Sequence, residues 1–417
     1  MYAKKLIRSL TKWPSVFHFC SDIRRKLSKV GFEEYKENEI PQFAKSGFVI
    51  RHNRSVIAWK YNGHESFVAS CSHCDYPHLK ISGKPEAFGK NNLTINLVKY
   101  GGITYNTWVD RNLKMVGRIL VLDENGEPKS ILYDSVVTFG VIPSNSAMNS
   151  LTGTLNSPVD IKPIPMKVII NIKETPTFAD YIAQQIHVKK ENILSWNLQM
   201  VNFQPPSVFS GMIHAQGLDN LENTFTSLEA FLQSSPEIGS TIIFAAFDSE
   251  EISSSTSVGA KSDFFESTLQ SLLGEELQKI RLKSLILSVD SGHGAHPLYP
   301  DSIDSNTKVN LGKGLIIERE NGGTTSSTPL TEIIPRLAAQ RINENIQGAS
   351  EKNTKSSGST IGPILEKLIG VPTVDAGICL LSMHSIRELG SIKDVDCSIK
   401  ILVEIMSHYR ELCALIN

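Results

Sequence analysis

The sequence lacks two features that would fix a class of protein at once. It contains no uninterrupted run of about 18 apolar residues, the length that a membrane-spanning helix requires. Neither sign of charge dominates, since 42 basic residues face 43 acidic ones and the net charge is −1. The chain therefore has no overall field that attracts nucleic acid or an anionic membrane. We expect neither a membrane nor a nucleic acid among its partners.

Cysteine is also scarce, with six in 417 residues. Scattered cysteines in so long a chain do not form a disulfide framework. Cys71 and Cys74 have CxxC spacing, but no second CxxC follows at a distance that suits a structural zinc knuckle. The first residues, MYAKKLIRSLTKWPSVF, show no apolar core or small-residue cleavage site of a signal peptide. We expect a folded N-terminus and a reducing, cytoplasmic location.

What the chain does have is the composition of a soluble globular protein, with 41% apolar and 20% charged residues. The pattern of strand-like and helical runs along the chain changes twice. Residues 89–199 consist of short β-rich runs such as NLTINLVKY and MKVIINI, separated by turn residues. On either side, strand-like runs alternate with helical patterns. These patterns predict an α/β domain formed by residues 1–88 and 200–417, and a β-rich domain inserted over 89–199.

Five short segments place His, Asp or Glu where an apolar strand or helix ends, and strand ends are where α/β sheets usually form sites. They are SHCD with His73 and Asp75, GLDN with Asp219, FDSEE with Glu250 and Glu251, SVDSGHGAH with Asp290, His293 and His296, and LSMHS with His384. Two metal ions about 4 Å apart need a bridging carboxylate and roughly two further ligands each. Zinc accepts imidazole nitrogen and carboxylate oxygen. The segments supply such a set, together with an acidic residue that can take a proton from water.

Each residue also has a simpler interpretation. A lone aspartate such as Asp219 or Asp290 most often caps a helix or forms a turn, and adjacent glutamates such as Glu250 and Glu251 usually lie in a solvated loop. Here the two glutamates directly follow the apolar run IIFAAF. Two carboxylates at the end of a buried strand are electrostatically unfavourable, and a bound dication would offset that cost. The joint pattern indicates a metal centre.

The order and the residues of these segments resemble those of the aspartyl aminopeptidase family, a group of dinuclear zinc metallo-exopeptidases. The resemblance runs nearly end to end and is most specific in SVDSGHGAHPLYP and SGSTIGPILEKLIGVPTVDAGICLLSMHSIRE. It implies an α/β fold, with a mixed-sheet catalytic domain that has helices on both faces. It also implies that the β-rich insert is a dimerisation domain. The expected assembly is a homo-oligomer, typically dimers assembled into a dodecamer.

The resemblance assigns five residues to the metal ions. His73 and Asp290 would hold one ion, Glu251 and His384 would hold the other, and Asp219 would bridge them. The implied cofactors are two divalent ions per subunit. Zinc is expected, and cobalt or manganese would suit the same ligands.

Three further residues receive roles by the same resemblance. Glu250 would be the general base, Asp75 would orient His73, and His293 would contact the substrate. The implied activity is that of a metallo-aminopeptidase. It would remove N-terminal residues from peptides through attack by a water molecule that bridges the two ions.

The sequence departs from the family near the substrate. In GKGLIIERENGG, Glu318 stands where the family has a lysine associated with acidic side chains. A carboxylate at that place would repel Asp and Glu. Thr325 falls near the place of a family tyrosine, and Met148 near that of a histidine that reaches a neighbouring subunit's site. We therefore predict that Glu318 contacts the substrate and that the preference is shifted away from Asp and Glu.

Two alternatives remain beside this prediction. One is an inactive or weakly active peptide-binding shell protein of the same fold. Unchanged peptidase activity after Glu250→Gln would count against the catalytic role. The other is a different dinuclear hydrolase, such as a deacylase or a carboxypeptidase, which analysis of the released products would reveal.

Overall fold

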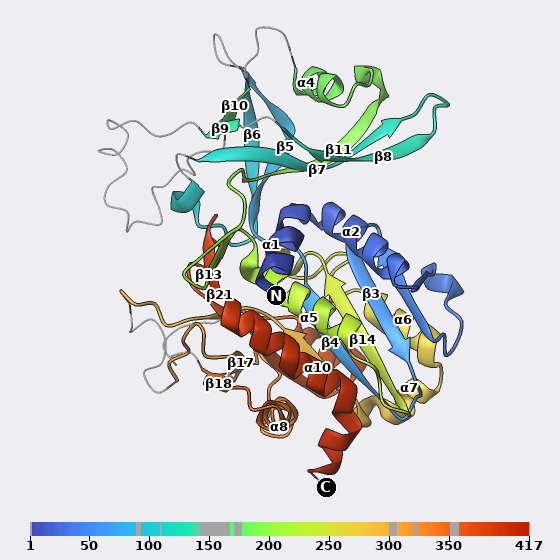
Figure 1. The fold of residues 1–417 in the computed structure, drawn as a ribbon. Helices are drawn as coiled ribbons and strands as arrows, with labels where there is room; N and C mark the ends of the chain where they lie inside the picture. Colours follow the sequence, from blue (N-terminus) through green and yellow to red (C-terminus); the bar gives the residue numbers. More distant parts are fainter. Residues whose placement is uncertain are drawn as a thin grey trace. The chain divides into compact units, whose positions relative to one another are not determined.

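Figure 1 shows the fold in a computed structural model of the chain. The structure describes residues 2–88, 93–108, 111–136, 139–141, 167–170, 177–299, 307–319, 323–350 and 358–416. Met148 lies outside these residues, so its expected position remains a prediction. The chain forms two compact units. The first, called the α/β unit, comprises Met1–Tyr76, Pro206–Met383 and Glu388–Asn417, and the second, called the β-rich unit, comprises Pro77–Pro205 and His384–Arg387.

A nine-stranded mixed sheet forms the centre of the α/β unit. In spatial order its strands are β1 (Glu33–Glu34), β2 (Ser46–Arg51), β3 (Ser55–Tyr61), β14 (Ser240–Phe247), β4 (Ser66–His73), β15 (Leu285–Val289), β19 (Thr373–Gly377), β17 (Leu315–Glu318) and β18 (Ile346–Ala349). The four central strands, from β14 to β19, run parallel, whereas β3 and β17 are antiparallel to their neighbours in that group. Every residue of β14 and β4 is buried. Such strands are buried on both faces, as parallel sheets require.

Helices cover both faces of this sheet, which confirms the predicted fold class (Figure 1). The helices of the unit are α1 (Tyr2–Lys12), α2 (Val16–Lys29), α5 (Leu218–Gln233), α6 (Phe264–Leu273), α7 (Glu276–Ile280), α8 (Ile333–Arg341), α9 (Gly362–Ile369) and α10 (Ile392–Ala414). On one face α5 lies against β4 and β14, with α10 packed upon it. On the other, Phe264 of α6 and Leu365 of α9 share a buried apolar cluster with Phe67 of β4. No described helix is long and apolar enough to cross a membrane.

Two small sheets complete the α/β unit. One contains β12 (Ser207–Phe209), β13 (Met212–Ala215) and β21 (Glu388–Ser391), and the other contains β16 (Gly292–His293) and β20 (Cys379–Leu380). The second sheet follows directly after β15 and β19 along the chain. It therefore extends the carboxyl ends of two central strands, where the candidate site lies.

The β-rich unit is an antiparallel sheet whose strands close into a ring. The strands are β11 (Ile193–Asn202), β5 (His78–Phe88), β6 (Leu93–Tyr100), β10 (Lys167–Ile170), β9 (Phe139–Val141), β7 (Asn112–Leu122) and β8 (Pro128–Asp134). The ring closes because β7 pairs with β11 as well as with β8 and β9. Its core contains Trp108, Met200 and Phe178, the first residue of α4 (Phe178–Gln185).

Candidate metal centre

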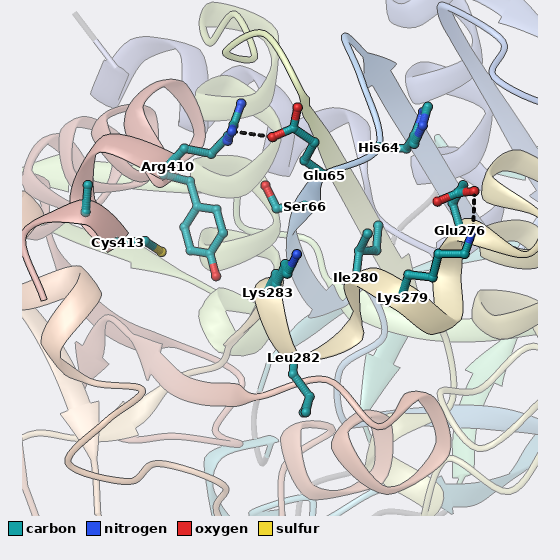
Figure 2. A pocket seen from close by; sticks show the side chains of 12 residues that line it. His64, Glu65, Ser66, Glu276, Lys279, Ile280, Leu282, Lys283, Arg410 and Cys413 are labelled. Atoms are coloured by element: carbon teal, nitrogen blue, oxygen red, sulfur yellow. Dashed lines mark hydrogen bonds and ion pairs between the residues drawn. The ribbon is translucent and has the colours of Figure 1, made fainter. Parts of the chain in front are cut away.

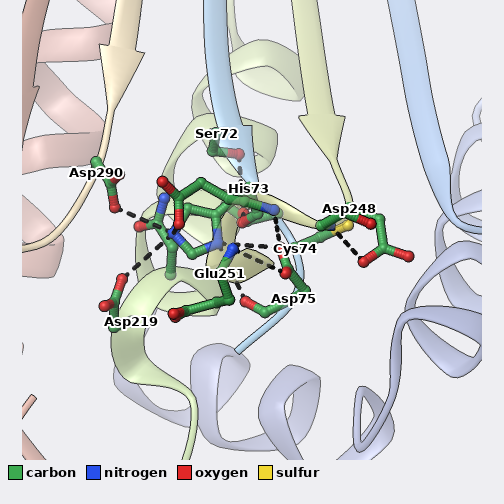
Figure 3. A network of polar contacts seen from close by, with 12 residues as sticks. Ser72, His73, Cys74, Asp75, Asp219, Asp248, Glu251 and Asp290 are labelled. Carbon is green, nitrogen blue, oxygen red and sulfur yellow. Dashed lines mark hydrogen bonds and ion pairs between the residues drawn. The ribbon is translucent and has the colours of Figure 1, made fainter. Parts of the chain in front are cut away.

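The predicted acidic residues gather at one edge of the central sheet (Figure 3). His73 is the last residue of β4, Glu250 and Glu251 lie in the 3-10 turn after β14, and Asp290 follows β15. These strands are parallel neighbours, so their carboxyl ends meet. Asp219, in the first turn of α5, reaches the same edge.

His73 stands at the middle of the cluster. Its Nε2 lies 3.3 Å from Asp290 Oδ1, 3.5 Å from Asp219 Oδ1 and 3.9 Å from Glu250 Oε2. The residue is 1% exposed. Its Nδ1 lies 3.1 Å from the backbone carbonyl oxygen of Asp75, a group that only accepts hydrogen bonds. The proton therefore belongs on Nδ1, which leaves Nε2 as the atom able to bind a metal ion.

The carboxylate of Asp75 ties the histidine to the turn that carries the glutamates. One oxygen accepts the amide of Glu250 at 3.1 Å, and the other accepts the amide of Glu251 at 3.2 Å. The first oxygen also lies 3.3 Å from His73 Nδ1. A single buried side chain thus contacts the His73 ring and the backbone amides of both glutamates.

The electrostatics of the cluster suit a cation. Burial raises the pKa of Glu250 to about 8, helped by nearby carboxylates and opposed by His73. Burial and Asp219 raise the pKa of Glu251 well above its usual range. Burial alone would lower the pKa of His73, but Asp290 and the other carboxylates raise it well above the ordinary value. Ligand atoms of His73, Glu250 and Glu251, and of His73, Asp219 and Asp290, lie within 4.8 Å of one another. A hard or borderline dication fits this donor set.

Contacts at the start of α5 hold Asp219 in place. Gly217, just before the helix, has φ 75°, and a Cβ there would lie 2.9 Å from the ring of Tyr76. Glycine is therefore required by both backbone conformation and space. The amide of Asp219 donates to Glu388 Oε2 at 3.2 Å. Glu388 is buried and was missed by the sequence analysis, because nothing in SIRELG marks it as a partner of a residue so distant in the chain.

His384 belongs to the β-rich unit by its contacts. Its Nδ1 lies 3.1 Å from the carbonyl oxygen of Gly102, and its own carbonyl accepts the amide of Thr104 at 3.1 Å. Its φ of 63° is left-handed. As at His73, the carbonyl contact places the proton on Nδ1 and leaves Nε2 available as a ligand.

The residues expected near the substrate lie in β16, at the end of β17 and in the segment that follows β17. His293 is exposed in β16. Glu318 ends β17, and its Oε1 fills the space that a Cβ at Gly292 would need. Its carboxylate therefore lies against the strand that carries His293 and follows Asp290. Thr325 is half-buried.

A second acidic residue at this edge was missed by the sequence analysis. Asp248, 1% exposed, directly follows β14 and forms an ion pair with Arg54. Its place after the run IIFAAF was a usable signal. The pairing was not readable, because the two residues are 194 positions apart.

The opposite end of β4 also carries charged side chains, in a pocket of about 830 Å³ that includes Ser66, the first residue of the strand. Figure 2 shows that two ion pairs line it, Arg410 with Glu65 and Lys279 with Glu276. The close gathering of histidine and carboxylate ligand atoms seen around His73 has no counterpart among the described residues that line this pocket. The candidate site is therefore the His73 end.

A parallel sheet with buried imidazole and carboxylates at its carboxyl edge is typical of metal-dependent hydrolases. The family model described as aminopeptidase I zinc metalloprotease (M18) matches residues 9–405, and the chain belongs to this family.

Curated relatives and solved structures agree with that assignment. Probable M18 family aminopeptidase 2 of Clostridium novyi is 29% identical and covers 97% of this chain and 98% of its own. The same-named protein of Ectopseudomonas mendocina is 28% identical and covers 96% and 97%. Among solved structures, an M18 aminopeptidase of Thermotoga maritima has a TM-score of 0.85 at 19% identity, over 97% of this chain and 96% of its own. The mApe1 dodecamer of S. cerevisiae has a TM-score of 0.85 at 22% identity, over 100% and 98%. At these identities the structures support the fold.

Proposed function

We propose that this chain is a metallo-aminopeptidase that removes N-terminal residues from peptides. The observation that carries the proposal is the gathering of His73 and four acidic side chains at the carboxyl edge of the sheet. Membership of the M18 family supports the reaction class. The cluster is buried or partly buried, so the charge of its carboxylates favours a cation more strongly than that of an exposed cluster would.

The ligands we propose are the five that the sequence predicted. His73 and Asp290 would hold one divalent ion, Glu251 and His384 would hold the other, and Asp219 would be shared between them. When bound, two such ions supply positive charge that makes water more acidic and stabilises negative charge on the scissile carbonyl oxygen. We propose zinc, with cobalt and manganese as the alternatives that the same donors accept.

Glu250 is the proposed general base. It lies beside His73 without being needed as a ligand, and its side chain is largely buried. It takes the proton of the attacking water and gives it to the leaving amine. This role requires the ionised carboxylate, which nearby dications favour over the protonated form. Asp75 keeps Glu250 aligned through the backbone amide and keeps the His73 proton on Nδ1.

The proposed preference is for basic or neutral N-terminal side chains over acidic ones. Glu318 supports it, because its carboxylate lies against Gly292, next to His293. An acidic substrate side chain at this edge would meet like charge, whereas lysine or arginine would meet opposite charge. His293 is proposed as the substrate-contacting histidine.

We also propose a homo-oligomer in the cytoplasm, built from dimers through the β-rich unit. The dodecameric assembly of mApe1, which shares the fold, supports an oligomer. The six cysteines, all within the described residues, form no disulfide bond there, and five of them are buried; a reducing compartment suits such cysteines. Analytical ultracentrifugation and cell fractionation test these two proposals.

The experiment that tests the function is a substrate panel on metal-depleted protein. Peptides that begin with Asp, Glu, Leu, Lys or Arg are assayed while zinc, cobalt or manganese is returned stepwise. We expect no cleavage without metal, recovery as two equivalents bind, and release of single N-terminal residues. Metal binding without cleavage would favour the inactive peptide-binding shell, and release of C-terminal residues would favour a carboxypeptidase.

A further inference from the structure

The turn between β2 and β3 lies at the same sheet edge as the candidate metal centre. Strand β3 is antiparallel to β14, and Val56 near its start pairs with Ala246 near the end of β14. The turn preceding β3 contains His52 and Asn53, both with positive φ. Arg54 follows them and points its guanidinium toward the residues after β14.

Two residues of this turn hold Asp248. The Nε of Arg54 forms an ion pair with Asp248 Oδ2, and the hydroxyl of Ser55 accepts the Asp248 amide at 2.9 Å. Asp248 Oδ1 in turn accepts the amide of Ser249 at 2.6 Å. The thiol of Cys74, beside His73, donates to the Arg54 carbonyl at 3.3 Å. The turn thus contacts the ends of β4 and β14, two of the three strand ends that deliver metal-centre residues.

Ser249 is the point at which this contact affects the glutamates. Its φ of 70° is left-handed, a conformation that is uncommon for residues other than glycine. Its hydroxyl accepts hydrogen bonds from Arg54 Nη2 at 3.2 Å and from Thr256 at 2.9 Å. The next two amides, those of Glu250 and Glu251, are the ones that donate to Asp75. The conformation of Ser249 therefore sets the direction of both glutamates.

Charge gives Arg54 a second effect on the same turn. Asp248 is buried close to Asp75, and both burial and that neighbouring carboxylate raise the pKa of Asp248, to about 6, against the lowering effect of Arg54. Without the guanidinium, the buried Asp248 carboxylate would keep the unfavourable influence of Asp75 and lose the favourable influence of Arg54. The turn after β14 would then relax away from its present position.

We propose that Arg54 is a positioning residue for catalysis. By holding Asp248 and Ser249 it keeps the amides of Glu250 and Glu251 on Asp75, and so keeps both carboxylates directed at the metal centre. The proposal rests on the proposed function only in taking Glu250 as the base and Glu251 as a ligand. The geometry of the turn is independent of that function.

The chain offers a matched control in Arg51, which lies in the same hairpin. Arg51 forms ion pairs with Glu37 and with Asp263, the latter at 2.6 Å, and lies over the ring of Phe264. It is an arginine with buried and ionic contacts like those of Arg54, but it contacts no residue of the turn that carries the glutamates in the described structure. Its loss reports the cost of removing a hairpin arginine together with its ion pairs, its hydrogen bond to the Ser257 carbonyl oxygen and its contact with Phe264.

The test compares Arg54→Ala, Arg54→Lys and Arg51→Ala in the full-length, metal-saturated protein. We expect Arg54→Ala to lower kcat about 10- to 100-fold with KM within about twofold, the size typical of residues that orient a metal site. Arg54→Lys restores part of kcat, because lysine replaces the charge but cannot bond Asp248 and Ser249 together. Arg51→Ala leaves kcat within about twofold. Equal kcat in Arg54→Ala and Arg51→Ala overturns the proposal.

Two further measurements separate this proposal from the proposed function. Combining Arg54→Ala with Asp248→Asn should lower kcat no further than Arg54→Ala alone, since both act through one contact; additive losses would contradict that route. Hydrogen exchange at the amides of Glu250 and Glu251 should become about tenfold faster in Arg54→Ala and stay unchanged in Arg51→Ala. If the wild-type protein has no peptidase activity, the proposed function fails, and unchanged exchange in Arg54→Ala would still refute the holding of the turn.

Discussion

The two ends of strand β4 present charged side chains in opposite ways. At the Ser66 end, each basic side chain named above has an acidic partner, and the pairs stand at the surface of an open pocket (Figure 2). At the His73 end, one imidazole faces several buried carboxylates (Figure 3). The charges of the two named pairs cancel in the first arrangement, whereas in the second the carboxylates outnumber the imidazole.

The difference shows where the α/β unit gives up stability for function. Exposed ion pairs contribute roughly 0 to 1 kcal/mol and are screened by salt. Buried, unbalanced carboxylates are costly unless a cation joins them. The same strand therefore begins in a region governed by ordinary surface electrostatics and ends in one that needs a ligand. Changes at the His73 end should have large, metal-dependent effects, and changes at the Ser66 end should not.

The largest effect is expected from Glu250→Gln. The amide keeps the size of the side chain but cannot take a proton, so kcat should fall roughly 10³-fold, within the range of general-base removal. Metal content, measured by atomic emission, should stay at the wild-type level because Glu250 is not a proposed ligand. Wild-type activity in this variant would contradict the role of Glu250 as the general base.

Removal of the metal should come next in size. A ligand that binds only the native state at about 1,000 times its Kd stabilises it by roughly 4 kcal/mol. Chelation should therefore lower the denaturation temperature, and added zinc should restore it. Glu65→Gln, at the balanced end, should show the same shift as the wild type. A denaturation temperature unaffected by the chelator would contradict a cation at the His73 end.

The free energy of unfolding of the metal-free protein should depend on pH because of the carboxylates at the His73 end. The pKa of Glu250 is raised by burial from 4.5 to about 8, so the native state binds more protons than the unfolded state in this window. The free energy of unfolding should therefore fall as pH rises from 4.5 to 8, by about 1.4 kcal/mol per pH unit for one such group. Glu251 contributes with the same sign.

Urea unfolding of the metal-free protein between pH 5 and 8 measures this slope, and Glu250→Gln should reduce it. Zinc should abolish the slope, because a bound dication keeps the carboxylates ionised. A free energy that rises with pH in the metal-free protein would contradict the assigned charges.

A smaller effect is expected from Glu318→Gln. Loss of one carboxylate near the substrate should lower the ratio of kcat/KM for N-terminal Lys over Asp by about tenfold, which corresponds to about 1.4 kcal/mol. The activity on N-terminal Leu should change little, which serves as the internal control. A wild-type enzyme that prefers Asp and Glu would refute the proposed preference itself.

The smallest effect is expected from Glu65→Gln at the Ser66 end. The Glu65 side chain is 64% exposed, so its ion pair with Arg410 should contribute no more than about 1 kcal/mol to stability. Activity and metal content should be unchanged. A loss of activity here would erase the contrast between the two ends of β4.

The sequence predicted the fold class, and the structure brings together His73 and the acidic residues that stand where apolar runs end. His73 ends a strand whose residues are all buried, and Glu250 and Asp290 each follow such a strand. Hydrophobic pattern is a local property, and the carboxyl ends of parallel strands meet by geometry. The likeness of these segments to a known family added the roles, which the patterns alone left open.

The remaining features depend on contacts between distant parts of the chain. The Arg54–Asp248 ion pair joins a hairpin turn to a strand end 194 positions away. The left-handed φ of Ser249 has no signal of its own, because serine ordinarily avoids that conformation. The closure of the β-rich ring through β7 and β11 likewise depends on long-range pairing. No periodicity in one segment reveals a partner in another.

The pairing of β5 with β11 within the ring has a consequence for how the chain folds. Strands β4 and β14 pair in parallel, with His73 opposite Phe247, so about 170 residues must be looped out before they meet. Within the β-rich unit, however, β5 and β11 are paired neighbours, with Leu79 opposite Met200. Once this unit has formed, the two ends of the insert are already held side by side.

The looped-out chain then behaves as if it were only about 50 residues long, which lowers the entropy of closure by about 1 kcal/mol. During synthesis the insert emerges before β14 does, so it can fold first. The insertion that interrupts the α/β unit in sequence thus brings together the two chain segments that flank it. This lowers the entropy cost of pairing β4 with β14.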